Sequence, residues 1–232
     1  MSGFVFKQFS VEQTRAAMKV STDGILLGAW ATLTNATRIL DIGTGTGLLA
    51  LMAKQRAPQA TVMAIEIDHD ACIDARANFT NSPWSDIRLY QGAVQSFDSP
   101  EPVDVIITNP PYFNASLKGE NAPRNAARHT DGLSFNELIA ACSRLSHDKT
   151  LLNVILPCPE AEQFIAIAKQ LGWHLNQQCL IQTTPKKAPS RCLMLFSQQA
   201  IECKKSQLVI HAQDGSYSAD YQRLCKAFYL KM

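Results

Sequence analysis

The stretch that decides the fold reads Arg38-Ile39-Leu40-Asp41-Ile42-Gly43-Thr44-Gly45-Thr46-Gly47. Its first half is an apolar run of the kind that forms a buried strand. Its second half is rich in glycine, which lets the backbone turn tightly beside a ligand before a helical pattern begins at 48. The nicotinamide fingerprint needs its third glycine at the sixth place, whereas Gly47 stands at the fifth. The Asp41 carboxylate also suits a cationic or hydroxyl-bearing ligand better than a pyrophosphate.

Strand and helix patterns alternate along the rest of the chain. Strands separated by helical stretches of this length indicate βαβ units and a parallel, doubly wound α/β sheet. The end of the chain differs, because 173–183 and 191–197 are strand-like with no helix between them, which predicts an antiparallel hairpin at the sheet edge. Ser134 and Glu137 are spaced like a capping box. The predicted strands are 38–42, 61–65, 87–90, 103–108, 151–156 and 207–211, and the predicted helices are 48–56, 70–78, 133–145, 160–171 and 217–229.

The composition limits the class of protein. The 232 residues are 46% hydrophobic and 18% charged, which suits a sizeable buried core. A net charge of +2 does not by itself indicate a protein that binds nucleic acid. The seven cysteines are scattered and odd in number, which argues against a disulfide framework or a zinc site. With no signal-peptide pattern and no apolar run long enough to span a bilayer, we expect a cytoplasmic protein without a metal.

Asn109-Pro110-Pro111-Tyr112 follows the buried run 103–108. Pro111 has no N–H and restricts Pro110 to an extended conformation, so carbonyl groups of this turn can point outward. The Asn109 side-chain oxygen and the Pro110 carbonyl can then each accept a hydrogen from a planar –NH2 group. The Tyr112 ring can stack on the face of the same substrate. The motif therefore predicts a pocket for an amino-bearing planar group.

A second acidic residue supports this reading. Glu66 ends the predicted second strand, where a carboxylate can bind both hydroxyls of a ribose. Together with Asp41 it favours S-adenosylmethionine over a nicotinamide cofactor.

The chain resembles class I S-adenosylmethionine-dependent methyltransferases of the N6-adenine type. More narrowly, it is similar to the bacterial valine-tRNA (adenine-N6)-methyltransferases, which modify the adenosine 3′ of the anticodon. The resemblance implies a Rossmann-like, mostly parallel seven-stranded sheet with helices on both faces. It also implies a methyltransferase domain over 34–232, with 1–33 covering the cofactor and substrate site as part of one compact unit. The stretches that carry it are 6–9, 19–30, 41–47, 109–112, 127–129 and 228–230.

The resemblance also implies roles for single residues. Thr22 and Asp23 would cover the cofactor, although the same pair reads as an ordinary helix N-cap. The stretch Gln91–Val94 lacks the carboxylate that often binds the cofactor's adenine, so a backbone N–H near Ala93 or a folded-in Asp98 would replace it. The full cofactor set is Thr22, Asp23, Asp41, Gly43, Thr44, Gly45, Glu66, Ile67, Ala93 and Asn109.

Catalysis is assigned to Asn109, Pro110 and Tyr112. Two acceptors can orient the lone pair of a poorly nucleophilic adenine nitrogen toward the methyl donor, so positioning and electrostatics supply much of the rate. His129 is more often structural than catalytic in such a place. Contacts with tRNA would come from scattered cations and from Phe113, with Phe6 and Phe9 as further stacking residues. The cations are Lys7, Lys19, Arg124, Arg128, Lys186, Lys187 and Arg191, for which a solvated surface is the alternative.

Several other activities fit the same motifs. An enzyme that methylates N5 of a protein glutamine, or the guanine N2 of ribosomal RNA, could use the Asn-Pro-Pro-Tyr pocket. A DNA adenine methyltransferase commonly carries a recognition domain for which this chain lacks room. A non-catalytic RNA-binding module would have eroded the glycine loop or the amide pocket, and the glycine spacing opposes a nicotinamide oxidoreductase. We expect tRNA as partner and a monomer.

Overall fold

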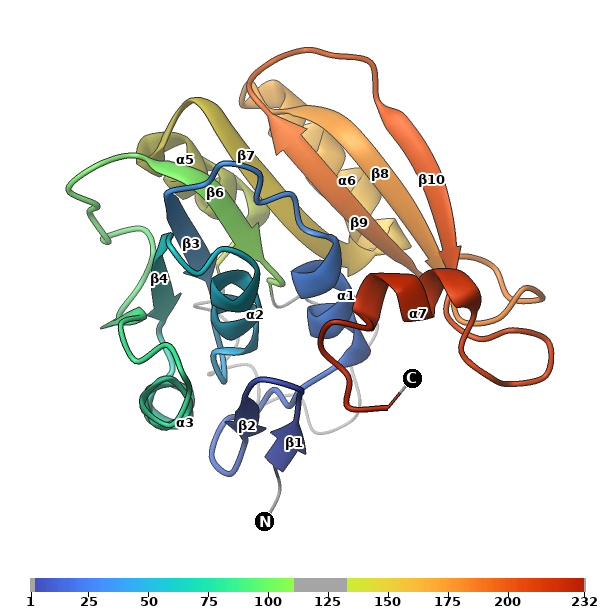
Figure 1. Cartoon of the computed structure of the whole chain (residues 1–232). Helices are drawn as coiled ribbons and strands as arrows, with labels where there is room; N and C mark the ends of the chain where they lie inside the picture. Colours follow the sequence, from blue (N-terminus) through green and yellow to red (C-terminus); the bar gives the residue numbers. More distant parts are fainter. Residues whose placement is uncertain (1–2, 111–132, 232) are drawn as a thin grey trace, which may run out of the picture.

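The computed structural model describes residues 3–110 and 133–231, which form one large sheet between two layers of helices (Figure 1). Within these residues the sheet has eight strands in the order β10-β8-β9-β7-β6-β3-β4-β5. The strands are β3 (Arg38–Ile42), β4 (Thr61–Glu66), β5 (Arg88–Gln91), β6 (Val103–Thr108), β7 (Ser146–Pro157), β8 (His174–Gln182), β9 (Arg191–Ser197) and β10 (Lys204–Val209). The helices are α1 (Thr22–Trp30), α2 (Leu48–Arg56), α3 (His69–Thr80), α5 (Phe135–Leu145), α6 (Cys158–Gln170) and α7 (Ala219–Cys225).

The strand directions confirm the predicted α/β class. β3 pairs in parallel with β4 and β6, and β5 and β7 extend the parallel part on either side. β9 runs antiparallel to both of its neighbours, β7 and β8. The side chain of Ser134 and that of Glu137 form the predicted capping box at the start of α5.

The far edge of the sheet differs from the expectation of seven strands ending in a hairpin. β10 pairs in parallel with β8, so it adds an eighth strand and forms the edge of the sheet. Its sequence begins Lys204-Lys205-Ser206-Gln207, and all four residues are exposed. This strand forms by backbone pairing with β8 rather than by burial of side chains, so apolar periodicity does not reveal its start. Lysines on an edge strand also discourage pairing with other chains.

Successive side chains of the central strands point into two different cores. Val105 and Ile107 belong to the cluster formed with α1, α2, α3 and α7. Ile106 belongs to the cluster formed with α5 and α6 on the opposite face. The sheet is therefore covered on both faces, as parallel sheets require.

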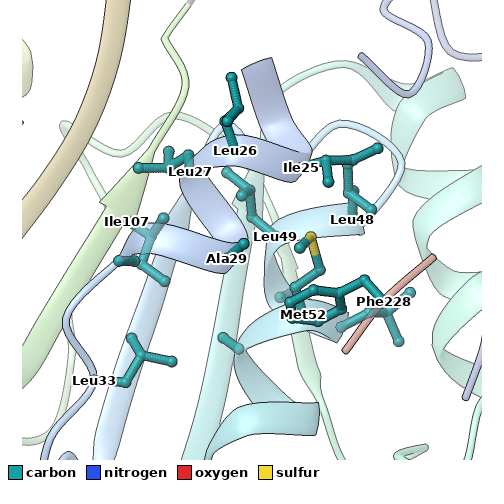
Figure 2. Close-up of a cluster of buried hydrophobic side chains, with 14 of the residues drawn as sticks. Ile25, Leu26, Leu27, Ala29, Leu33, Leu48, Leu49, Met52, Ile107 and Phe228 are labelled. Atoms are coloured by element: carbon teal, nitrogen blue, oxygen red, sulfur yellow. The ribbon is translucent and has the colours of Figure 1, made fainter. Parts of the chain in front are cut away.

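Helices α1 and α2 approach each other closely in the first cluster (Figure 2). Gly28 of α1 faces Met52 of α2, and a β-carbon placed on Gly28 would lie 2.5 Å from the Met52 Sδ. Arg56 Nη1 donates to the Gly28 carbonyl at 2.7 Å. Glycine at position 28 thus sets how near the two helices lie.

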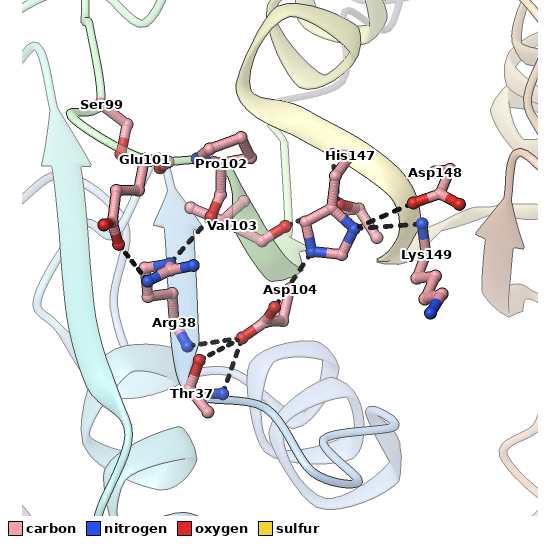
Figure 3. A network of polar contacts seen from close by, with 11 residues as sticks. Thr37, Arg38, Ser99, Glu101, Pro102, Val103, Asp104, His147, Asp148 and Lys149 are labelled. Carbon is pink, nitrogen blue, oxygen red and sulfur yellow. Dashed lines mark hydrogen bonds and ion pairs between the residues drawn. The ribbon is translucent and has the colours of Figure 1, made fainter.

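A polar network joins three strands at their amino ends, opposite the glycine loop (Figure 3). Asp104 Oδ2 accepts hydrogen bonds from the Thr37 N–H and hydroxyl, both at 2.7 Å, and from the Arg38 N–H at 2.9 Å. Asp104 Oδ1 lies 3.0 Å from His147 Nε2. Burial alone would raise the pKa of Asp104, but the hydrogen bonds from His147, Thr37 and Arg38 outweigh it and hold that pKa below its usual value. The network fastens β3, β6 and β7 together.

The N-terminal residues form a separate two-stranded sheet of β1 (Gly3–Val5) and β2 (Ser10–Glu12). Among the described residues, none of the helices has both the length and the apolar character to cross a membrane. The same part of the chain contains no group of three or more His, Cys, Asp or Glu side chains arranged to hold a metal ion.

Candidate active site

The glycine loop lies at the carboxyl end of β3 and leaves open space above it. Gly43 and Thr44 donate their N–H groups to the Ile65 carbonyl at 2.9 and 3.0 Å, which ties the loop to β4. Gly43 and Gly45 have φ of +72° and +56°, and a β-carbon on either would meet no atom within 4 Å. Gly47 has a different role, because a β-carbon there would lie 2.5 Å from the Phe79 ring. The first two glycines therefore face a ligand space and the third allows packing against α3.

Asp41 is fully buried beneath this loop. Its Oδ2 accepts from the Thr44 hydroxyl at 2.5 Å and from the Ala50 N–H at 3.1 Å. Its Oδ1 has no hydrogen-bond partner among the described residues. Burial raises the pKa of the Asp41 carboxyl to about 7, although the bonds from Thr44 and Ala50 lower it. A buried carboxylate oxygen without a partner fits the cationic end of the cofactor expected from the sequence.

Glu66 lies where β4 ends, beside the glycine loop. Its Oε2 accepts from the Gly45 N–H at 2.8 Å, and its Oε1 accepts from the N–H groups of Ile67 and Asp68 at 2.9 Å. Since a carboxylate offers about four acceptor positions and these bonds use three, a position on Oε2 is still open to a ribose hydroxyl. The three backbone bonds fix the direction of the carboxylate before a ligand arrives.

A cavity of about 310 Å³ joins these parts of the site. It runs from the glycine loop past Glu66 and Ile67 to Ala93, and on to Asn109 and Pro110 at the end of β6. A smaller adjoining pocket includes Thr44 together with Gly43, Gly45 and Asn109. The carboxyl ends of β3, β4, β5 and β6 thus bring most of the predicted cofactor residues together, as expected for a doubly wound sheet.

Some predicted residues lie outside the described part of the chain. Of the Asn-Pro-Pro-Tyr motif the structure describes Asn109, which is half-buried, and Pro110, which is buried. The Thr108 hydroxyl just before them donates to the Ile42 carbonyl at 2.9 Å and links this strand end to the glycine loop. The residues for which the predictions fall outside the described ranges are Pro111, Tyr112, Phe113, Arg124, Arg128 and His129.

Thr22 and Asp23 are placed differently from the expectation. Ser21 is the N-cap of α1, and its hydroxyl accepts from the Gly24 N–H at 3.3 Å. Asp23 forms an ion pair with Arg191, with 2.7 Å between Oδ2 and Nε. Neither Thr22 nor Asp23 is among the residues that line the cavity. Earlier residues of the N-terminal segment take that place, namely Ala16, Ala17 and Met18, which no sequence motif marks.

The proposed RNA-contacting cations are scattered and differ in their surroundings. Lys7 Nζ donates to the Lys226 carbonyl at 2.6 Å, and Lys19 Nζ donates to the Gln13 carbonyl at 2.5 Å. Lys186 and Lys187 are exposed in the turn between β8 and β9. Arg191 is held by Asp23 and by the Ser190 carbonyl.

Two expectations about neighbouring residues are wrong. Phe6 and Phe9 are only 2% and 6% exposed and stack on each other in the core, so they cannot stack on RNA bases. Asp98 does not fold into the cavity, because its side chain is 95% exposed and lies 3.5 Å from Arg144. An adenine contact near Ala93 would therefore use the backbone.

Comparison with known proteins identifies the family to which the chain is similar. The model of the methyltransferase small domain family matches residues 22–128. The chain is 56% identical over all 232 residues to a tRNA1(Val) (adenine(37)-N6)-methyltransferase of Pseudoalteromonas translucida, with 100% of both chains covered. It is 43% identical to the protein of that name from Vibrio campbellii, over 99% of this chain and 96% of the relative.

Solved structures confirm the fold. A predicted O-methyltransferase from Agrobacterium tumefaciens aligns with a TM-score of 0.67 at 19% identity, over 89% of this chain and 96% of that one. A putative RNA methyltransferase from Pyrococcus horikoshii aligns with a TM-score of 0.52 at 22% identity, over 74% and 79%. The fold is that of the class I methyltransferases, and by its full-length relatives this chain belongs to the tRNA1(Val) (adenine(37)-N6)-methyltransferase family.

Proposed function

We propose that this protein transfers a methyl group from S-adenosylmethionine to N6 of adenosine 37 in tRNA1(Val). The observation that carries the proposal is the cavity that joins Gly43, Gly45 and Glu66 to Asn109 and Pro110. Relatives of the same length that are named for this reaction support the choice of substrate.

The residues around the glycine loop would hold the cofactor. Glu66 would accept from its ribose, and Asp41 Oδ1 would face its positively charged amino-acid end. The open faces of Gly43 and Gly45 would allow the chain to approach it closely. S-adenosylmethionine supplies an activated methyl group on a sulfonium centre.

Asn109 and Pro110 would orient the target base. The Asn109 side-chain oxygen and the Pro110 carbonyl would accept the two amino hydrogens of adenine, which turns the nitrogen lone pair toward the methyl donor. Asn109 is neutral at every working pH, so it needs no deprotonation to act as an acceptor. The adenine nitrogen becomes acidic only once methylated, so its proton can leave to water after transfer.

The tRNA would be held by cations outside the cavity. Lys186 and Lys187 are exposed in the β8–β9 turn, which begins at the carboxyl end of β8. β8 points the same way as β7, since both run antiparallel to β9, so this turn lies at the same edge of the sheet as Asn109. Residues 1–33 would act with the domain 34–232 as one unit. We propose a monomer that works in the cytoplasm, where its tRNA is processed.

The proposal is tested by methyl transfer from labelled S-adenosylmethionine to total tRNA from a strain that lacks this gene, followed by nucleoside analysis. We expect labelled N6-methyladenosine, confined to tRNA1(Val) after fractionation. Asn109→Ala should lower the rate by at least about a hundredfold, because the loss of a positioned acceptor in a catalytic site has this size.

Two controls make the result specific. Lys149→Ala changes an exposed residue at the opposite end of the sheet and should leave the rate unchanged. If tRNA stays unlabelled while ribosomal RNA or a release factor takes up the methyl group, the substrate assignment is wrong and the cofactor site stands.

A further inference from the structure

The N-terminal segment passes over the cavity as a short loop, residues 13–20, which we name the strap. Ala16, Ala17 and Met18 of the strap line the main cavity. Met18 also lines the smaller pocket beside Thr44 and Asn109. Met18 is 50% exposed, which is unusual for a methionine, whereas Ala16 of the same loop is buried. The strap thus presents an apolar side chain at the junction of the glycine loop and the proposed base pocket.

Two buried polar residues of α3 hold the strap from below. Asp74, which is 4% exposed, accepts from the Arg15 and Ala16 N–H groups at 2.9 Å and from the Thr14 hydroxyl at 3.1 Å. Burial would raise the pKa of Asp74, but these hydrogen bonds outweigh it and keep that pKa below its usual value. The carboxylate therefore stays ionised, and all three strap donors are paired.

Asn78 lies one helical turn further along the same face of α3. Its Oδ1 accepts from the Glu12 N–H at 2.8 Å, and its Nδ2 donates to the Glu12 carbonyl at 2.9 Å. The same Nδ2 also donates to the Thr46 carbonyl in the glycine loop at 2.9 Å. One buried amide thus connects Glu12, the residue directly before the strap, with the glycine loop.

The two ends of the strap are also joined to each other by hydrogen bonds. The Gln13 side-chain oxygen accepts from the Val20 N–H at 2.6 Å, and the Gln13 carbonyl accepts from Lys19 Nζ at 2.5 Å. A loop with both ends fixed and its middle held by a carboxylate has little freedom left to lose when a ligand binds.

We propose that Asp74 and Asn78 are positioning residues that hold the strap as a preformed wall of the cofactor cavity, with Met18 packing on the bound cofactor. Neither residue touches the cavity itself, so they act through the strap. The inference rests on the proposed function only for the identity of the ligand, S-adenosylmethionine.

Calorimetric titration of the full-length protein with S-adenosylmethionine tests this without any tRNA. Asp74→Ala should raise the Kd on the order of tenfold, the size expected when charge-assisted hydrogen bonds are lost. Met18→Ala should raise it about three- to tenfold, from the apolar surface that the cofactor no longer covers. Asp74→Asn keeps one acceptor oxygen and should recover part of the affinity.

Limited trypsin digestion gives a second readout. The two cleavage sites in the strap follow Arg15 and Lys19, and the next residues have their N–H groups bound by Asp74 and Gln13. Cleavage there should be slow in the wild type and slower with S-adenosylmethionine present. It should be at least about tenfold faster in Asp74→Ala, because opening the strap no longer breaks those bonds.

Asp86→Ala is the matched control, because Asp86 pairs with the buried Lys54 at 2.7 Å ahead of β5, at the end of the sheet away from the cavity. It should lower the unfolding temperature and leave the Kd unchanged. If Asp74→Ala fails to fold, Gln13→Ala opens the base of the strap instead and should raise both the Kd and the cleavage rate. Equal Kd values in the wild type and the strap variants would overturn the inference. Wild-type binding with weakened variants but no tRNA methylation would leave the strap standing and refute the proposed substrate.

Discussion

Replacement of Gly28 by alanine tests how α1 and α2 pack. The new β-carbon would lie 2.5 Å from the Met52 Sδ, 2.8 Å from its Cε and 3.1 Å from its Cβ. Met52 is fully buried, so its side chain has no solvent into which it can move. Overpacking of this kind costs about 1–3 kcal/mol. Alanine in a helix regains about 1 kcal/mol relative to glycine, so the net loss should be about 0–2 kcal/mol.

A double-mutant cycle separates this clash from other effects. Met52→Ala alone should cost about 2–5 kcal/mol by leaving a cavity. In the double variant the methyl group introduced at position 28 enters that cavity, so the pair should cost no more than Met52→Ala alone. Urea unfolding followed by circular dichroism gives the four free energies of unfolding. Additivity within about 0.5 kcal/mol would refute the proposed contact, because residues that do not interact behave in that way.

Two further predictions concern pH. Asp104→Asn should lower the free energy of unfolding by about 2 kcal/mol at neutral pH, where the ionised carboxylate accepts its hydrogen bonds. The pKa of Asp104 is lowered in the native state, so the stability lost in Asp104→Asn should shrink as pH falls below about 4. Urea titrations that show the same loss of stability at all pH values would contradict this prediction. Asp41 has the opposite sign: its native pKa is raised to about 7, so its ionisation should destabilise the ligand-free protein as pH rises from about 4 to 7. The stability difference between wild type and Asp41→Asn should therefore move in favour of Asp41→Asn over that range, and a constant difference would show that Asp41 does not titrate there.

The central strands could be predicted from the sequence because a strand that is buried on both faces appears as a continuous apolar run. Arg38–Ile42, Val103–Thr108 and Arg191–Ser197 have the predicted bounds. β7 instead begins at Ser146, five residues before the prediction, because His147, Asp148 and Lys149 are polar and show no apolar periodicity, and His147 lies in the network around Asp104. The prediction misplaces β10 for the same reason.

The candidate site could be predicted where a residue type suited to binding a ligand stands at the end of a predicted strand. Gly43 and Asn109 each follow a strand and Glu66 ends one, and parallel strands bring their carboxyl ends together. The strap could not be predicted, since Ala16 and Ala17 have no chemical signature and the residues that hold them lie on α3, far along the chain. Phe6 and Phe9 show the converse limit, because an aromatic side chain suits a core as well as a base.

The Asp104 network lies at the opposite end of the strands from the cavity, and this separation bears on how the protein could be redesigned. Because this network holds β3, β6 and β7 together at their amino ends, residues at the carboxyl ends of these strands can be replaced while the strands stay paired. Position 109 and the strap could therefore be varied in a library aimed at other amino-bearing bases, with Thr37, Asp104 and His147 kept constant. The amino ends of the strands would keep the sheet together, and the residues at the carboxyl ends would determine which base is bound.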